Sequence, residues 1–286
     1  MRPSAFRQVF PSKPIRLIIA NTTGTSVDTL ARVLGVRLGE ELGQQVVSDN
    51  RAGAGGLIGA EIVANSPPDG YTLLISSTGM QVITPQIYKK LNYEPVKSFA
   101  PLSLFAVTQN ILVVNPGLPI NSVKELITYA KANPGKLNMS NAGAGFQSHL
   151  AGVLFMHATG IDVHQVPYKG GASLIAVIGN ESQFTIAPSP AVMAHVRSGR
   201  LRALASGGEK RSPQTPDMPT ISEAGVPGYL STGWAGLMAP KGISKAIFDK
   251  LYATIVKVVN QPQTRELLAR QGGDPVTTTP AEFVQL

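Results

Sequence analysis

Strand-like and helix-like segments alternate along almost the whole chain, and this alternation restricts the folds that the chain can adopt. The apolar run Ile15–Ala20 is followed by Thr29–Leu42, in which apolar residues recur at helical spacing. A second series of the same kind extends from residue 121 to residue 205. Strands separated by helices pair in parallel, and the helices cover the sheet. The pattern therefore predicts an α/β fold in which mainly parallel sheets are flanked by helices.

Two apolar segments divide this pattern into two lobes. The run Phe99–Asn115 is long and β-rich, and Gly233–Ala239 is a single apolar strand that follows a connector rich in Pro, Ser and Gly. A chain of 286 residues with 43% hydrophobic content suffices for two cores. The polar residues at 108–110 interrupt the first run, and we interpret both segments as crossings between two lobes. The predicted first lobe comprises residues 1–107 and 231–286, the second comprises 108–230, and the hinge crossings lie near 105–110 and 228–234.

Each lobe has one polar loop between a strand and a helix, at residues 21–28 and 140–148. The start of a helix presents unpaired N–H groups and a partial positive charge, so each loop is a candidate anion-binding seat. Ligands bind at the carboxyl ends of strands in such folds, so we expect the two seats to face one cleft. The candidates are Asn21, Thr22, Thr23, Thr25 and Asp28 in the first loop, and Asn141, Gly143, Gly145, Gln147 and Ser148 in the second.

Further polar residues follow strands, and each has two interpretations. Ser77 and Thr78 either contact the ligand or form a simple turn. His149 either donates to an anion or makes a structural hydrogen bond. Lys169 either contacts a carboxylate or stays solvated. Trp234, the sole tryptophan, either forms a wall of the cleft or packs in the core.

Charge and composition argue against several classes of function. The net charge of +8 favours anionic partners, but Lys and Arg are scattered, so we expect no nucleic-acid partner. The chain lacks cysteine and its four histidines have no metal-ligand spacing, so no metal is predicted. The stretch Gly53–Gly59 resembles a dinucleotide-binding fingerprint. The next strand, Tyr71–Ser76, ends without the acidic residue that a ribose requires, so no cofactor is predicted.

Six short motifs occur in the order found in one protein family. The chain resembles the Bug receptors, the substrate-binding proteins of tripartite tricarboxylate transporters, from about Phe10 to Leu286. The resemblance implies a periplasmic binding protein of the two-lobe, type II Venus-flytrap class, with the export signal absent from this chain. It also implies a receptor, not an enzyme, that delivers a small anionic ligand to membrane permease subunits, and we expect a monomer. The motifs are Phe10–Leu17, Asn50–Gly56, Pro68–Leu74, Val166–Gly170, Gly199–Ala205 and Pro219–Gly225.

The resemblance is weakest where the ligand is expected. The family pattern Pro-Phe-x-Pro-Gly-Gly-x-x-Asp is replaced by Ala20-Asn-Thr-Thr-Gly-Thr-Ser-Val-Asp28. Where the family often has Phe-Asp-Asn, this chain has Ala187-Pro188-Ser189, so Ser189 joins the candidates. The aspartate of that family motif, which this chain lacks, would suit an amino group of a ligand. We therefore expect the ligand to be a mono- or dicarboxylic acid without an amine. Two alternatives stay open: a ligand-sensing partner of a signalling receptor, and an enzyme on the same frame, for which no convincing set of catalytic groups exists.

Overall fold

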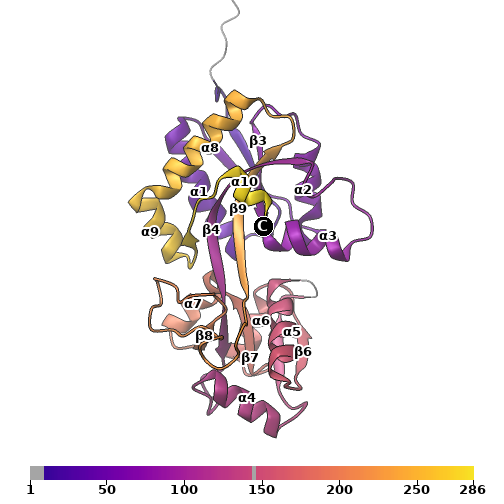
Figure 1. Cartoon of the computed structure of the whole chain (residues 1–286), viewed down its shortest axis with the longest axis vertical. Helices are drawn as coiled ribbons and strands as arrows, with labels where there is room; N and C mark the ends of the chain where they lie inside the picture. The colour runs from indigo at the N-terminus through magenta and orange to yellow at the C-terminus, as the bar shows by residue number, and fades with distance from the viewer. Residues whose placement is uncertain (1–9, 144–145) are drawn as a thin grey trace, which may run out of the picture.

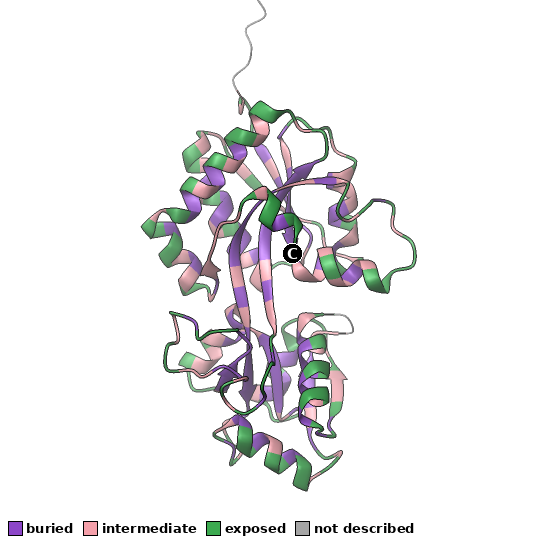
Figure 2. Cartoon of the chain, viewed as in Figure 1, coloured by how far each residue is buried: buried purple, intermediate pink, exposed green. Residues whose placement is uncertain are grey.

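Two long antiparallel strands connect an upper and a lower body (Figure 1). They are β4 (Phe99–Val114) and β9 (Thr232–Pro240), in a computed structural model that describes residues 10–143 and 146–286. Their pairing begins at Phe99 with Pro240 and ends at Gln109 with Thr232. Buried residues follow both strands and the sheet interiors, whereas exposed residues lie on the outer faces of the helices (Figure 2). We call the upper body the first lobe and the lower body the second lobe.

The first lobe is built on one mixed sheet with strand order β2-β1-β3-β9-β4, and β10 also pairs with β4. The pairs among β1, β2 and β3 are parallel, whereas β9 is antiparallel to β3 and to β4. Helices bury their apolar faces against it in a core that includes Leu34, Phe105 and Ile255. The strands are β1 (Ile15–Ile19), β2 (Val46–Asn50), β3 (Thr72–Ser77) and β10 (Asp274–Pro275). The helices are α1 (Ser26–Leu42), η1 (Ala54–Gly56), α2 (Leu57–Ala64), η2 (Gly79–Ile83), α3 (Thr84–Ile87), α8 (Lys245–Asn260), α9 (Pro262–Arg270) and α10 (Pro280–Val284).

The second lobe repeats this plan with its own core, which includes Leu126, Phe155 and Phe184. Strand β5 pairs in parallel with β6 and β7, and the far end of β4 runs antiparallel to β7 and β8. The strands are β5 (Asn138–Asn141), β6 (His164–Pro167), β7 (Phe184–Pro188) and β8 (Arg202–Ser206). The helices are α4 (Val123–Ala132), α5 (Gln147–Thr159), α6 (Ala172–Ile178) and α7 (Ser189–Arg197).

Strand β4 changes partners in its middle without a break. It pairs with β9 as far as Gln109 and with β7 from Asn110 onward. The polar residues at 108–110 therefore stay within a continuous strand, and the change of partner falls within the predicted crossing at 105–110. The lobe boundaries themselves and the hinge positions remain a prediction.

The structure adds elements that the sequence pattern does not predict. Strand β10 has only two residues, and a π-helical turn (η2) leads directly into α3. The crossing strands make the sheets mixed, because both run antiparallel to their neighbours. The alternating βα series on either side of them is present as predicted.

Next to β10, side chains of the second lobe bind the backbone and a carboxylate of the first. The Ser189 hydroxyl donates to the Gly272 carbonyl. Gln214 Nε2 donates to Gly273 O at 3.1 Å and to Asp274 Oδ1 at 2.8 Å. Ser212 Oγ donates to the same Asp274 oxygen at 2.8 Å. The two lobes are therefore joined beside the crossing strands as well as through them.

Replacing Gly272 by alanine is expected to lower the free energy of unfolding by more than the same change at Gly199. Both glycines have left-handed φ angles, +80° and +72°, which cost an alanine about 1–2 kcal/mol. A Cβ at Gly272 would also lie 2.8 Å from Pro190 N, whereas one at Gly199 would meet nothing within 4 Å. Urea unfolding of both variants tests this, and equal losses would show that the contact with Pro190 yields without cost.

Candidate ligand-binding site

A side-chain cap holds the first loop at the start of α1. Thr25 Oγ1 accepts a hydrogen bond from Asp28 N at 3.4 Å and donates to Thr22 O at 2.9 Å. Thr29 Oγ1 donates to Thr25 O at 3.0 Å. An N-cap threonine satisfies one of the N–H groups that a helix start leaves unpaired. This cap explains why α1 begins at Ser26, ahead of the predicted start at Thr29.

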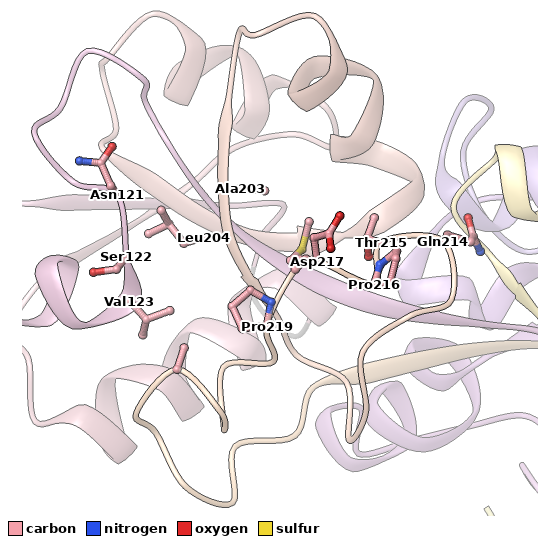
Figure 3. Close-up of a pocket in the computed structure, with 12 residues that line it drawn as sticks. Asn121, Ser122, Val123, Ala203, Leu204, Gln214, Thr215, Pro216, Asp217 and Pro219 are labelled. Atoms are coloured by element: carbon pink, nitrogen blue, oxygen red, sulfur yellow. The ribbon is translucent and has the colours of Figure 1, made fainter.

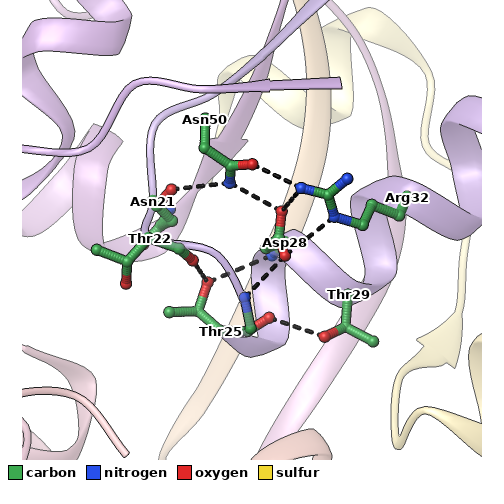
Figure 4. A network of polar contacts seen from close by, with 8 residues as sticks. Asn21, Thr22, Thr25, Asp28, Thr29, Arg32 and Asn50 are labelled. Carbon is green, nitrogen blue, oxygen red and sulfur yellow. Dashed lines mark hydrogen bonds and ion pairs between the residues drawn. The ribbon is translucent and has the colours of Figure 1, made fainter. Parts of the chain in front are cut away.

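A buried carboxylate fixes the shape of the same loop (Figure 4). Asp28 is 2% exposed. Its Oδ2 accepts hydrogen bonds from Gly24 N at 2.8 Å and Arg32 Nε at 3.1 Å, and its Oδ1 accepts one from Asn50 Nδ2 at 2.8 Å. Asn50 Nδ2 also donates to Asn21 O at 3.0 Å. Asp28 thus ties the loop to α1 and β2, and its predicted contact with a ligand remains a prediction.

The environment of Asp28 favours its charged form. Burial by itself raises the pKa of this carboxyl, but the hydrogen bonds from Arg32, Gly24 and Asn50 and the charge of Arg32 outweigh burial. The pKa therefore lies below its usual value of 3.8. The ion pair with Arg32, at 3.0 Å, offsets the negative charge beneath the first loop.

The glycine-rich stretch after β2 serves close packing. Gly55 and Gly56 have φ angles of 68° and 101°, which favour glycine. A Cβ at Gly56 would lie 2.7 Å from Met80, and one at Gly59 would lie 2.9 Å from the Cα atom of Ala20. The turn therefore lets α2 approach the end of β1, directly before the first loop.

The turn after β3 is bound to the second crossing strand. Thr78 Oγ1 accepts a hydrogen bond from Trp234 N at 2.9 Å, and Ser77 is 8% exposed. The Trp234 ring packs edge-on against Phe283, with 5.2 Å between the ring centroids. This contact favours the core-packing interpretation of the tryptophan. The hydroxyl of Thr78 is already engaged by β9, so the turn is held in place before any ligand binds.

Hydrogen bonds within the second loop fix its shape in the same way. Asn141 Oδ1 accepts from Gly143 N at 2.9 Å, and Ser148 Oγ accepts from Ala142 N at 2.9 Å. Asn141 Nδ2 donates to Gln165 Oε1 at 3.1 Å. Asn141 and Ser148 are only 1% and 4% exposed, so their side chains hold the loop backbone from the buried side.

The start of α5 has no capping side chain at its N-cap position, among the residues that the structure describes. Its N-cap residue is Phe146, whose side chain makes no capping hydrogen bond. His149 N donates to Phe146 O at 3.0 Å as part of the first helical turn. The predicted residue Gly145 lies outside the described residues.

The side chain of Gln147 lies against the second crossing strand. A Cβ at Gly233 would lie 2.3 Å from Gln147 Nε2. The next residue along β9, Trp234, is the one that Thr78 binds. The turn after β3 in the first lobe and the start of α5 in the second lobe therefore meet at one stretch of β9. We call Thr78, Gln147, Gly233 and Trp234 the β9 junction.

The remaining candidates lie in varied surroundings. Thr22 and Thr23 are exposed on the first loop. Lys169 is also exposed, and its carbonyl accepts a hydrogen bond from Ala172 N at 3.2 Å. Ser189 is 8% exposed, and its hydroxyl is engaged by Gly272. The structure therefore brings Thr78 and Gln147 to the β9 junction, whereas Ser189 belongs to the contact beside β10.

A separate hollow of ≈ 650 Å³ lies in the second lobe (Figure 3). It is formed by β8, the start of α4 and the connector before β9, with Ser122, Leu204 and Met218 among its lining residues. None of the residues predicted to bind a ligand lines it.

Comparison with known proteins agrees with this architecture. Residues 30–286 match the tripartite tricarboxylate transporter family receptor. The chain belongs to this receptor family. Protein BugT of Bordetella pertussis is 38% identical over 273 residues, which is 95% of this chain and 84% of BugT. The predicted resemblance to the Bug receptors is therefore confirmed.

Solved structures show the same fold. The R. palustris protein Rpa4515 with adipate has a TM-score of 0.91 and 34% identity, over 96% of this chain and 93% of Rpa4515. MatC (Rpa3494) from Rhodopseudomonas palustris with bound malate has a TM-score of 0.83 and 28% identity, over 96% and 95% of the two chains. These likenesses confirm the two-lobe α/β binding-protein fold.

Family membership sets the general role of the chain. Receptors of this family are periplasmic solute-binding proteins that work with the membrane components of a transporter. In the part of the chain that the structure describes, no helix is long and apolar enough to cross a bilayer.

Replacing Asp28 by asparagine is expected to lower the free energy of unfolding by about 2 kcal/mol at neutral pH, because hydrogen bonds to a charged group are stronger than those to an amide. The pKa of Asp28 is lowered in the folded protein. Its stabilising contribution is therefore complete above the usual value of 3.8 and is lost as the pH falls through the folded-state pKa. Urea unfolding of both proteins, at neutral pH and at the lowest pH that leaves them folded, measures the difference.

Glu94→Gln is the matched control, since Glu94 forms an exposed pair with Lys97 at 2.9 Å. Exposed pairs contribute little to stability, so this variant is expected to unfold like the unmodified protein. An Asp28→Asn difference that stays constant down to low pH would contradict the assignment of the lowered pKa.

Proposed function

We propose that the protein captures a small carboxylate, a mono- or dicarboxylic acid without an amine, for a tripartite tricarboxylate transporter. The observation that carries this proposal is the β9 junction. There the turn after β3 and the start of α5, which belong to opposite lobes, reach neighbouring residues of one crossing strand. Two related structures, Rpa4515 with adipate and MatC with bound malate, support the class of ligand.

The two loops suit an anion held by neutral donors. The first loop offers exposed Thr22 and Thr23 beside the start of α1, and the second offers the start of α5, where the N-cap residue Phe146 makes no side-chain capping hydrogen bond. Helix starts favour negative charge, and hydroxyl groups can donate directly or through water. Asp28 does not repel the anion strongly, because its charge is buried and paired with Arg32. No catalytic reaction is assigned to this arrangement.

We propose a ligand without an amino group because the first loop has no carboxylate left to bind one. A bound ammonium group needs an unpaired carboxylate or several acceptors. The acid of the first loop, Asp28, is committed to Arg32, Asn50 and Gly24. After β7 the chain has Pro188 and Ser189, and the Ser189 hydroxyl already donates to Gly272.

We further propose that the lobes, residues 1–107 with 231–286 and residues 108–230, close over the ligand by bending near 105–110 and 228–234. The change of partner in β4 between Gln109 and Asn110 supports this position, because each half of the strand belongs to a separate sheet. Hinge closure of this kind needs only a few residues to change their backbone angles. The contact between Gln214 and Asp274 lies beside the proposed hinge.

A binding screen tests the ligand class. Adipate, succinate, malate, hexanoate, glutamate and aspartate are each titrated into the protein by calorimetry, with thermal unfolding as a second readout. We expect an organic acid to bind and to stabilise the protein by about 2.7 kcal/mol at a hundred times its dissociation constant. Tight binding of glutamate or aspartate without binding of the other acids would overturn the exclusion of an amine.

Small-angle X-ray scattering tests the closure. The radius of gyration is expected to decrease when the best ligand of the screen is added, because the two lobes approach each other. Sucrose at matched concentration is the control for effects of the added solute. Binding in calorimetry with an unchanged radius of gyration would leave the ligand class standing and overturn the hinge.

A further inference from the structure

The β9 junction contains a buried polar group that has no hydrogen-bond partner among the described residues. Gln147 is the first residue of α5, and its side-chain nitrogen Nε2 is buried. Among the described residues this nitrogen has no hydrogen-bond partner. A buried amide N–H without a partner is unfavourable, so such a group is retained where something else satisfies it.

Gly233 leaves the space on β9 that this amide occupies. The atoms Nε2 and Oε1 of Gln147 would lie 2.3 Å and 2.7 Å from a Cβ at Gly233. Only a glycine therefore lets the amide lie over β9 at this point. The Gly233 carbonyl is turned to the other crossing strand, where it accepts a hydrogen bond from Thr108 Oγ1 at 3.4 Å.

The position of the amide places it beside elements of both lobes. Gln147 begins a second-lobe helix, while Trp234, the residue after Gly233, donates its backbone N–H to Thr78 of the first lobe. Under the proposed function, the ligand lies between these elements of the two lobes. An amide donates without carrying charge, so it can bind a carboxylate, carbonyl or hydroxyl oxygen.

We infer that Gln147 is a specificity-determining residue that donates a hydrogen bond to a second acceptor group of the ligand. It favours acids with a second carboxylate over monocarboxylic acids of the same length. This inference rests on the proposed function, because it assigns a role within the same binding site. It concerns the choice among carboxylates and not carboxylate binding itself.

Gln147→Met tests the inference, because methionine keeps the length of the side chain and removes the donor. Two matched pairs of probes are titrated by calorimetry: adipate with hexanoate, and succinate with butanoate. In the unmodified protein the diacid of at least one pair is expected to bind more tightly. In the variant this preference is expected to fall about tenfold, the usual effect of losing one hydrogen bond to a charged group.

Gln147→Glu provides a second, opposite test. Glutamate has the same shape but adds a negative charge, so the diacid is expected to lose more affinity than the monoacid. Gln263→Met, on the exposed surface of α9, is the matched control and is expected to leave all affinities unchanged.

Thermal unfolding without ligand separates this role from a structural one. The amide nitrogen of Gln147 makes no hydrogen bond among the described residues, so Gln147→Met is expected to melt at the same temperature as the unmodified protein or at a higher one. A lower melting temperature with an unchanged preference for the diacid would overturn the inference in favour of a structural role. If the unmodified protein binds none of the acids, the proposed function fails; if it binds them and the variant keeps the same preference, only the role of Gln147 fails.

Discussion

The pairing of β4 with β9 is the constraint on which the rest of the molecule depends. The two strands are antiparallel from Phe99 with Pro240 to Gln109 with Thr232, and Asn110 N still donates to Ser231 O at 3.1 Å. Both irregularities in this pairing, between Pro101 and Ser103 and between Leu104 and Ala106, fall within the first lobe, where such bulges increase the twist of a strand. The proposed movement of the lobes would therefore bend two hydrogen-bonded strands and would act on the contacts of Ser189 and Gln214 beside them, while each lobe keeps its own core.

The two proposed binding loops are held in shape by polar side chains that make hydrogen bonds within the protein. Asp28 holds the first loop, and Asn141 and Ser148 hold the second; all three are nearly inaccessible to solvent. Fixing the loops in this way lowers the entropy that a ligand must remove when it binds. It also leaves backbone N–H groups and exposed hydroxyls as the groups that can meet the ligand.

The alternation of strand-like and helix-like segments predicts most of the fold, because strands and helices of ordinary length show a clear periodicity of apolar residues. It does not predict β10, which is too short for a period, or the π-helical turn Gly79–Ile83, whose Met80 packs on Gly56 far away in the sequence. The candidate site can likewise be predicted only in part. Small polar residues at the ends of strands predict both loops, but no local pattern reveals that Ser189 is engaged by Gly272. The relation between Gly233 and Gln147 exists only in three dimensions.

The choice of ligand must come from short-range contacts. Rpa4515 with adipate and MatC with malate share this fold at 34% and 28% identity, so the frame alone does not distinguish one acid from another. The net charge of +8 attracts anions in general and speeds their arrival, but it acts alike on acids of the same charge. Between a diacid and a monoacid the net charge favours the diacid, and under our proposal a neutral donor adds to this preference when its position matches the second acceptor of the ligand. The buried amide of Gln147, which has no partner among the described residues, would give such discrimination under our proposal, because it would favour those ligands that complete its hydrogen bonding.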